Sequence, residues 1–136
     1  MVPAVGEGAW ADMTLEREST VGYRVVNKHE LARAEGTGTA TFEGALYGGI
    51  NLSFFWVEMP PGGGARLHRH PCEEIFLVQE GQARFTIGAS TLEVTAGQVV
   101  VVPAHVPHAF TNVGVGPLRQ IDILPSGHIV TEWLED

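Results

Sequence analysis

The chain has 136 residues, a formal net charge of −8 and 44% hydrophobic residues, which together indicate one globular domain with a substantial core. An acidic chain without a basic cluster is a poor candidate for binding nucleic acid or an anionic membrane, and no stretch approaches the roughly 18 apolar residues of a membrane-spanning helix. The N-terminus lacks the basic start and apolar core of a signal peptide, and the single cysteine, Cys72, cannot form an intramolecular disulfide, so we expect a cytoplasmic protein.

The first part of the chain has weak secondary-structure signals. Residues 1–20 mix glycine and acidic residues without a clear period, and we interpret them as an N-terminal arm that is flexible or contacts a partner. Residues 22–26 predict a first short strand, residues 28–35 predict one helical turn or a loop, and the threonine-rich residues 36–42 predict an edge strand. We therefore expect the folded domain to occupy residues 21–136.

From residue 51 onward, short strands and turns are predicted in rapid succession. Aromatic, β-branched or alternating residues predict strands at 51–59, 66–70, 74–79, 82–87, 91–95, 99–102, 109–113 and 118–124, and residues 129–134 predict a final strand or a helical turn. The 17 glycines and 8 prolines fall largely between these runs. Roughly nine or ten short strands without a long amphipathic helix indicate an all-β sandwich or barrel.

Three histidines and one glutamate stand out in this β-rich region. Residues two apart in a strand project from the same face, so His68 and His70 point together. Residues 71–73 have turn character, which lets Glu74 begin a returning strand and face the same point, and His108 opens another strand. Three imidazoles and one carboxylate are an ordinary ligand set for a divalent metal, and they do not choose among Fe, Mn, Ni, Co and Zn.

The spacing around these four residues resembles the two motifs of the cupin superfamily. Gly62-x5-His68-x-His70-x3-Glu74-x6-Gly81 matches the first motif at every fixed position, and Gly97-x5-Pro103-x-His105-x2-His108-x3-Asn112 matches the second except at His105, where the family usually has glycine. Fifteen residues separate the two motifs, as in small microbial cupins. The resemblance implies a single-domain jelly-roll barrel, or double-stranded β-helix, with one metal ion held in its mouth.

The choice of the carboxylate ligand rests on the same spacing. Only Glu74 keeps the six-residue gap to Gly81, so we interpret Glu73 as a solvated turn residue. Cys72 shares the strand parity of His70 and Glu74, but it lies in a turn after a proline, where parity no longer holds. A thiolate would also favour zinc, and we do not expect Cys72 to be a ligand.

The remaining histidines receive different interpretations. His105 lies in a turn, where a left-handed conformation carries a cost for a residue with a Cβ. Its side chain either faces the solvent at the barrel rim, or lies next to His108 and orients that residue or transfers protons. His29 and His128 lie outside both motifs, and we expect them at the surface.

Five further residues are candidates for the wall of the substrate pocket. Phe76 and Phe110 each lie two residues after a predicted ligand, so they could line the cavity beside the metal. Arg66 either meets an anionic substrate or is a solvated arginine at the rim. Gln120 and Asp122 share one face of the strand 118–124, and the sequence does not tell whether that face points inward.

Two functions fit this ligand set. We expect a metal-dependent enzyme, a dioxygenase (an oxidoreductase) or an isomerase, that acts on a small oxygenated molecule in the barrel. The alternative is a non-catalytic cupin that binds a small molecule and uses the metal as a structural or ligand-holding element. A titratable group that faces the site without being a ligand would favour catalysis.

The resemblance also implies a homodimer, because small cupins are often dimers whose N-terminal strands pack across the interface. Trp10 in the arm and Trp133-Leu134 in the tail fit such a contact.

Overall fold

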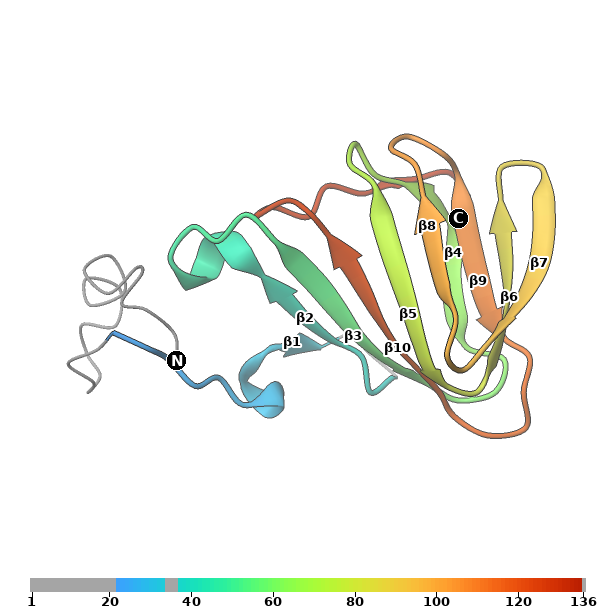
Figure 1. Cartoon of the computed structure of the whole chain (residues 1–136), viewed down its shortest axis with the longest axis horizontal. Coiled ribbons are helices and arrows are strands. Elements are labelled where there is room, and N and C mark those ends of the chain that lie inside the picture. Colours follow the sequence, from blue (N-terminus) through green and yellow to red (C-terminus); the bar gives the residue numbers. More distant parts are fainter. Residues whose placement is uncertain (1–21, 34–36, 136) are drawn as a thin grey trace.

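The computed structural model describes residues 22–33 and 37–135, which form two antiparallel sheets packed against each other (Figure 1). The six-stranded sheet has the order β1 (Ala32–Arg33), β2 (Ala40–Glu43), β3 (Ser53–Met59), β10 (Leu118–Leu124), β5 (Glu74–Glu80) and β8 (Val99–Val102). The five-stranded sheet has the order β11 (Glu132–Trp133), β4 (Gly64–Arg69), β9 (His108–Asn112), β6 (Gln82–Ile87) and β7 (Ser90–Thr95). The all-β prediction is confirmed, and the architecture is a jelly roll.

Two short 3-10 helices complete the described part of the chain: η1 (Lys28–Glu30) and η2 (Gly44–Tyr47). No helix in this part is long and apolar enough to cross a membrane.

Side-chain alternation decides which residues enter the space between the sheets. From Glu74 to Val78 in β5 and throughout β10 every second residue is buried, the pattern of a strand that packs one face on a core. Phe76 on β5, Phe85 on β6 and Phe110 on β9 belong to one hydrophobic cluster that joins both sheets. Gln120 and Asp122 are buried on β10, so the face that they share points inward.

The eight strands predicted between residues 51 and 124 are confirmed to within two residues at either end. The tail forms the short strand β11 and not a helical turn, and the helical turn predicted after residue 28 is η1. The structure has eleven described strands, and β1, which contains only two residues, lies within the segment 28–35 predicted as a helical turn or loop.

Two predictions for the N-terminal region need correction. The strand predicted at residues 22–26 is wrong: no described strand pairs with this segment, and Tyr23 and Val25 are exposed. The strand predicted at 36–42 begins only at Ala40 and ends at Glu43. It is not the edge strand, because the short β1 pairs along its outer side. The proposed arm at residues 1–20 lies outside the described residues.

The contact between β4 and β9 is unusually close at one end and irregular further along. A Cβ on Gly64 would clash with the carbonyl oxygen of Phe110, so only glycine allows this approach. The pairing then shifts between Ala65 and His68, and His68 comes to lie opposite His108. The two histidines therefore meet because of how these strands pair.

Candidate metal centre

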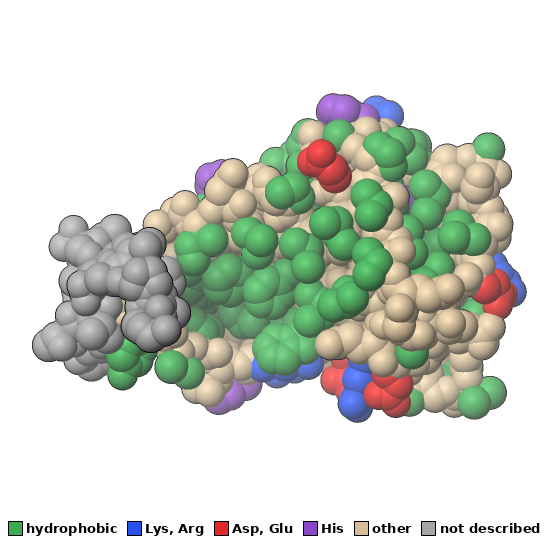
Figure 2. Space-filling model, viewed as in Figure 1, with side chains coloured by type: hydrophobic (Ala, Val, Ile, Leu, Met, Phe, Trp, Pro, Cys, Tyr) green, Lys and Arg blue, Asp and Glu red, His purple; other side chains and the backbone are tan. Residues whose placement is uncertain are grey.

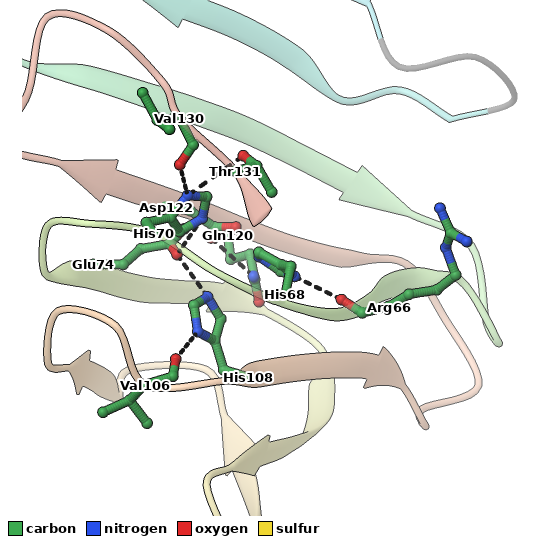
Figure 3. Close-up of polar contacts among 10 residues, drawn as sticks. All are labelled: Arg66, His68, His70, Glu74, Val106, His108, Gln120, Asp122, Val130 and Thr131. Carbon is green, nitrogen blue, oxygen red and sulfur yellow. Dashed lines mark hydrogen bonds and ion pairs between the residues drawn. The ribbon is translucent and has the colours of Figure 1, made fainter. Parts of the chain in front are cut away.

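Four buried side chains converge between the two sheets (Figure 3). His68 comes from β4, His70 from the turn that follows it, Glu74 from the start of β5 and His108 from the start of β9. One potential ligand atom from each residue lies within 4.8 Å of the others. The structure thus brings together the four residues that the sequence predicts as metal ligands.

Glu74 lies between two of the imidazoles. Its Oε1 is 2.9 Å from His108 Nε2 and 3.2 Å from His70 Nε2. The His68 ring completes the group, with its centre 4.3 Å from that of His108 and 5.0 Å from that of His70.

Each of the three histidines uses its Nδ1 atom for a backbone contact. A carbonyl oxygen only accepts a hydrogen bond, so each ring carries its hydrogen on Nδ1 and, when neutral, has a lone pair on Nε2. Such orientation of the ring through its far nitrogen is typical of metal-ligating histidines. The carbonyl partners of His68, His70 and His108 are Arg66 (2.6 Å), Val130 (2.8 Å) and Val106 (2.8 Å).

The electrostatics of His68 and Glu74 favour the forms that bind metals. Burial lowers the pKa of His68 to about 4, aided by the neighbouring His108 and His70 and opposed by the Arg66 carbonyl, so this imidazole is neutral at pH 7. Burial alone would raise the pKa of Glu74, but contacts with His108 and His70 lower it overall, so the group is a carboxylate. The pKa of His70 is raised: burial lowers it, and the contact with Glu74 outweighs burial. A cation at this point would take over the role of the His70 proton.

One buried nitrogen atom in the cluster lacks a hydrogen-bond partner, as expected if it binds a metal. His70 Nε2 is buried and makes no hydrogen bond of acceptable geometry, although it lies near Glu74. A buried polar atom without a partner is costly, and a metal ion among these atoms would satisfy it. The four residues therefore fit a divalent first-row metal.

A cavity of about 370 Å³ opens beside this cluster. Three of the four candidate ligands line it, and His108 is the exception. Of the predicted pocket residues, Arg66, Phe76, Phe110 and Asp122 line the cavity. Gln120 does not, but its Nε2 donates a hydrogen bond of 2.8 Å to Asp122 Oδ1. This volume suits a small molecule.

Several residues that line this cavity were not predicted from the sequence. Thr39 and Thr41 project from the region of β2, and Trp133 comes from β11. The Trp133 ring lies 4.9 Å from that of His68, and the Arg66 guanidinium lies 5.2 Å from its centre. In the sequence, only the alternation of threonine at positions 37, 39 and 41 could have indicated these lining residues, because it marks a polar face of a strand.

Residues next to the predicted ligands stay outside the cluster. Glu73 is exposed, as expected of a turn residue. Cys72 is half-buried and does not belong to the group, and burial together with Glu74 and Glu73 raises the pKa of its thiol.

His105 is the one described non-glycine residue with a positive φ, at 68°. Its side chain is exposed, in keeping with the solvent-facing alternative, while its backbone N–H donates a 2.8 Å hydrogen bond to the His70 carbonyl. The backbone of this residue thus fixes the turn that carries a predicted ligand.

Replacing His105 with glycine is expected to raise the free energy of unfolding by about 0.5–1 kcal/mol, because glycine adopts a positive φ without steric cost. Urea denaturation of the wild type and of His105→Gly would measure this change. His128→Gly, at an exposed site without a positive φ, is the control and should gain nothing. Equal or lower stability of His105→Gly would contradict the idea that the turn is strained.

The fold and the buried three-histidine, one-glutamate cluster define the class of protein. Residues 55–124, about half of the chain, match the family described as "Cupin domain". The chain therefore belongs to the cupin superfamily and is a small, single-domain member with a metal-site-like cluster.

Proteins that are similar in sequence include one from Methanocaldococcus jannaschii and one from Zea mays. An uncharacterised protein of Methanocaldococcus jannaschii is 32% identical over 93 residues, which cover 66% of this chain and 74% of that protein. Auxin-binding protein 5 of Zea mays is 37% identical over 70 residues, which cover 51% of this chain and 46% of that protein.

Similar solved structures include two bacterial oxalate decarboxylases. The Lactobacillus farciminis enzyme, in complex with formate, has a TM-score of 0.69 and 25% identity over 78% of this chain and 34% of its own. The Bacillus subtilis enzyme has a TM-score of 0.67 and 27% identity over 76% of this chain and 29% of its own. The B. subtilis enzyme has Mn(II) centres. The present chain spans about a third of the length of these enzymes.

Proposed function

We propose that this cupin is a metal-dependent enzyme, of dioxygenase or isomerase type, that acts on a small oxygenated molecule. The observation that carries the proposal is Asp122. It is a buried carboxyl group outside the candidate ligand set, yet it lines the same cavity as His68, His70 and Glu74. Burying a carboxyl group is costly, and such groups in clefts are typical of sites that transfer protons.

The surroundings of Asp122 suit an acid that donates a proton. Burial, and then repulsion from Glu74, raise the pKa of Asp122 well above its usual range, while the hydrogen bond from Gln120 opposes this. Burial and the neighbouring Glu74 thus favour the protonated form of this carboxyl group. Gln120 fixes its orientation, so that the group can give a proton to a substrate oxygen or take one back.

The cluster of His68, His70, Glu74 and His108 would hold the metal. When bound, a divalent ion would act as a Lewis acid, and Fe or Mn would add redox chemistry. The Mn(II) centres of the B. subtilis oxalate decarboxylase make manganese a candidate here. Phe76 and Phe110 give the cavity an apolar wall that would limit access of water.

The same cavity offers one cationic group to a substrate. Arg66 is exposed, lines the cavity and, among the described residues, has no ion-pair partner. The guanidinium lies 5.2 Å from the centre of the Trp133 ring, which lines the same cavity. A substrate carboxylate would pair with it, and the formate complex of the L. farciminis enzyme supports a small carboxylate as the first class to test.

Asp122→Asn is expected to lower kcat by about 100-fold or more, because the amide keeps the shape of the carboxyl group but cannot transfer its proton. The measurement is turnover and oxygen consumption with a panel of small carboxylates, sugar acids, diketones and phenols, using protein with its metal content determined. Glu73→Gln, an exposed carboxyl nearby, is the matched control and should leave kcat unchanged.

An unchanged kcat in Asp122→Asn with full metal content would contradict the catalytic role of this residue. The alternative function, a non-catalytic binding cupin, is favoured by the aromatic residues that line the cavity, Phe55, Phe76, Phe110 and Trp133. It would gain if every compound in the panel were inert while one of them bound tightly.

A further inference from the structure

The last described residues of the chain run along one side of the metal cavity. We call residues 129–135, which include β11, the C-terminal strap. Thr131 and Trp133 of this strap line the cavity, and the carbonyl oxygen of Val130 accepts the 2.8 Å hydrogen bond from His70 Nδ1. Figure 3 shows Val130 and Thr131 beside the His70 ring, opposite the carboxylate of the cluster. One segment thus forms part of the cavity wall and orients a candidate metal ligand.

The chain is firmly held just before the strap begins. The N–H of the buried Gly127 donates a 3.1 Å hydrogen bond to Asn51, and its carbonyl oxygen accepts one of 2.8 Å from Ala45. The carbonyl oxygen of Ser126 accepts a 2.7 Å hydrogen bond from the hydroxyl of the buried Ser53 on β3. This end of the strap is therefore attached to the six-stranded sheet, and Gly127 is a fixed pivot.

The strap itself contains no buried residue. Val130, Trp133 and Leu134 are 57%, 53% and 36% exposed. The ion pair that joins the strap to β4, with Arg69 Nε 2.8 Å from Glu132 Oε1, is also open to solvent. A segment with few buried apolar contacts and exposed polar contacts opens at a low free energy while the rest of the fold persists.

We propose that the C-terminal strap is a lid, which opens about Gly127 while the barrel stays folded and, when closed, positions His70 for the metal. Opening takes the carbonyl acceptor away from His70 Nδ1 and the Trp133 ring away from His68. Loss of such a supporting contact lowers metal affinity by about 10–100-fold. Because the two equilibria are linked, a bound metal favours the closed strap by the same factor. This coupling rests on the metal centre of the proposed function, whereas the opening of the strap does not.

The first measurement is hydrogen exchange of the full metal-free chain, followed by mass spectrometry with fragmentation to single residues. The Leu134 N–H donates a 2.9 Å hydrogen bond to the Leu67 carbonyl oxygen on β4, so it exchanges each time the strap opens. It should exchange about 100-fold or more faster than the amides of the central strand β10, which require a larger opening. Adding Mn(II) should slow exchange at Leu134 by about 10–100-fold.

Glu132→Lys is the variant that loosens the strap, because it replaces attraction to Arg69 by repulsion. Exchange at Leu134 and release of Mn(II) to an excess of chelator should both accelerate by the same factor, about 3–10-fold. Glu93→Lys is the matched control. It changes the net charge equally and breaks a similarly exposed pair, with Arg84 at 3.0 Å, across two strands of the same sheet, and it should keep the wild-type rates.

Both substitutions lie in the five-stranded sheet, so they leave unchanged the outer face of the other sheet, where Figure 2 shows hydrophobic side chains gathered over β3, β10 and β5. Both variants should therefore keep the circular dichroism spectrum of the wild type. If Glu132→Lys does not fold, Glu132→Gln, which only removes the charge, should give an acceleration of about twofold.

Two results would overturn the lid: exchange at Leu134 as slow as in β10, or Mn(II) release that a folded Glu132 variant leaves unchanged. A chain that binds no Mn(II) would count against the metal centre and not against the opening of the strap, because fast exchange at Leu134 in the metal-free chain would still support that opening.

Discussion

His68→Ala and His108→Ala are each expected to reduce bound metal from about one ion per chain to a small fraction of that. Each change removes an imidazole whose Nδ1 is held by a backbone carbonyl and whose Nε2 faces the other candidate ligands. Even loss of a group that only supports a ligand costs about 10–100-fold in metal affinity, so loss of a ligand should cost more. Elemental analysis of protein purified without added metal measures the effect.

The two variants should differ in the stability of the metal-free protein. His108→Ala also removes the 2.9 Å contact between its Nε2 and the buried Glu74 carboxylate, whereas His68 makes no such contact in the described part of the structure. Leaving a buried charge with fewer partners is expected to cost about 2 kcal/mol or more. His128→Ala, an exposed histidine outside the site, is the control for metal content and stability. Full metal content in both site variants would show that the cluster is not the metal centre.

Gly64→Ala is expected to lower the free energy of unfolding by about 3 kcal/mol, at the upper end of the range for overpacking. Its new Cβ would clash with the backbone of Phe110, and a backbone atom cannot move aside as the end of a side chain can. For a chain of this size the melting temperature should fall by roughly 10 °C. Thermal unfolding followed by circular dichroism provides the measurement.

A second glycine supplies the matched control for this substitution. Nothing lies within 4 Å of the position that a Cβ on Gly116 would occupy, and this residue does not need a positive φ. Gly116→Ala should therefore change the melting temperature by no more than a degree or two. If the two alanine variants melt together, the close approach of β4 and β9 is not required for folding. Metal content of Gly64→Ala would report whether separating these strands also moves His68 away from His108.

Local sequence was sufficient for the features that depend on neighbours in the chain. Alternation placed most strands, and the fixed spacing from Gly62 to Gly81 selected Glu74 over Glu73, which is exposed. The turn at His105 was also predicted, and its positive φ is the reason why glycine suits that position. These features follow from a few consecutive residues and their steric limits.

Features that depend on pairing between distant strands were not predictable in the same way. The inward direction of Asp122 follows from the register of β10 against β3 and β5, which the strand's own sequence does not encode. Trp133 reaches the cavity because β11 pairs with β4, some 65 residues earlier in the chain. The segment at residues 22–26 has the composition of a strand, but no described strand is available to pair with it.

Because side chains alternate along β5 and β10, one set of residues in these strands forms the cavity and the other set forms the outer surface of the sheet. Even-numbered residues such as Glu74, Phe76 and Asp122 face the cavity, and odd-numbered residues such as Ile75 and Ile121 face outward. Point substitutions at inward positions can therefore alter the chemistry of the cavity without changing the outer surface. Substitutions at outward positions can likewise alter the surface without changing the cavity, both in evolution and in protein engineering. A deletion of one residue within either strand would exchange the two sets, so we expect descendants of this chain to tolerate substitutions there and to reject single-residue deletions.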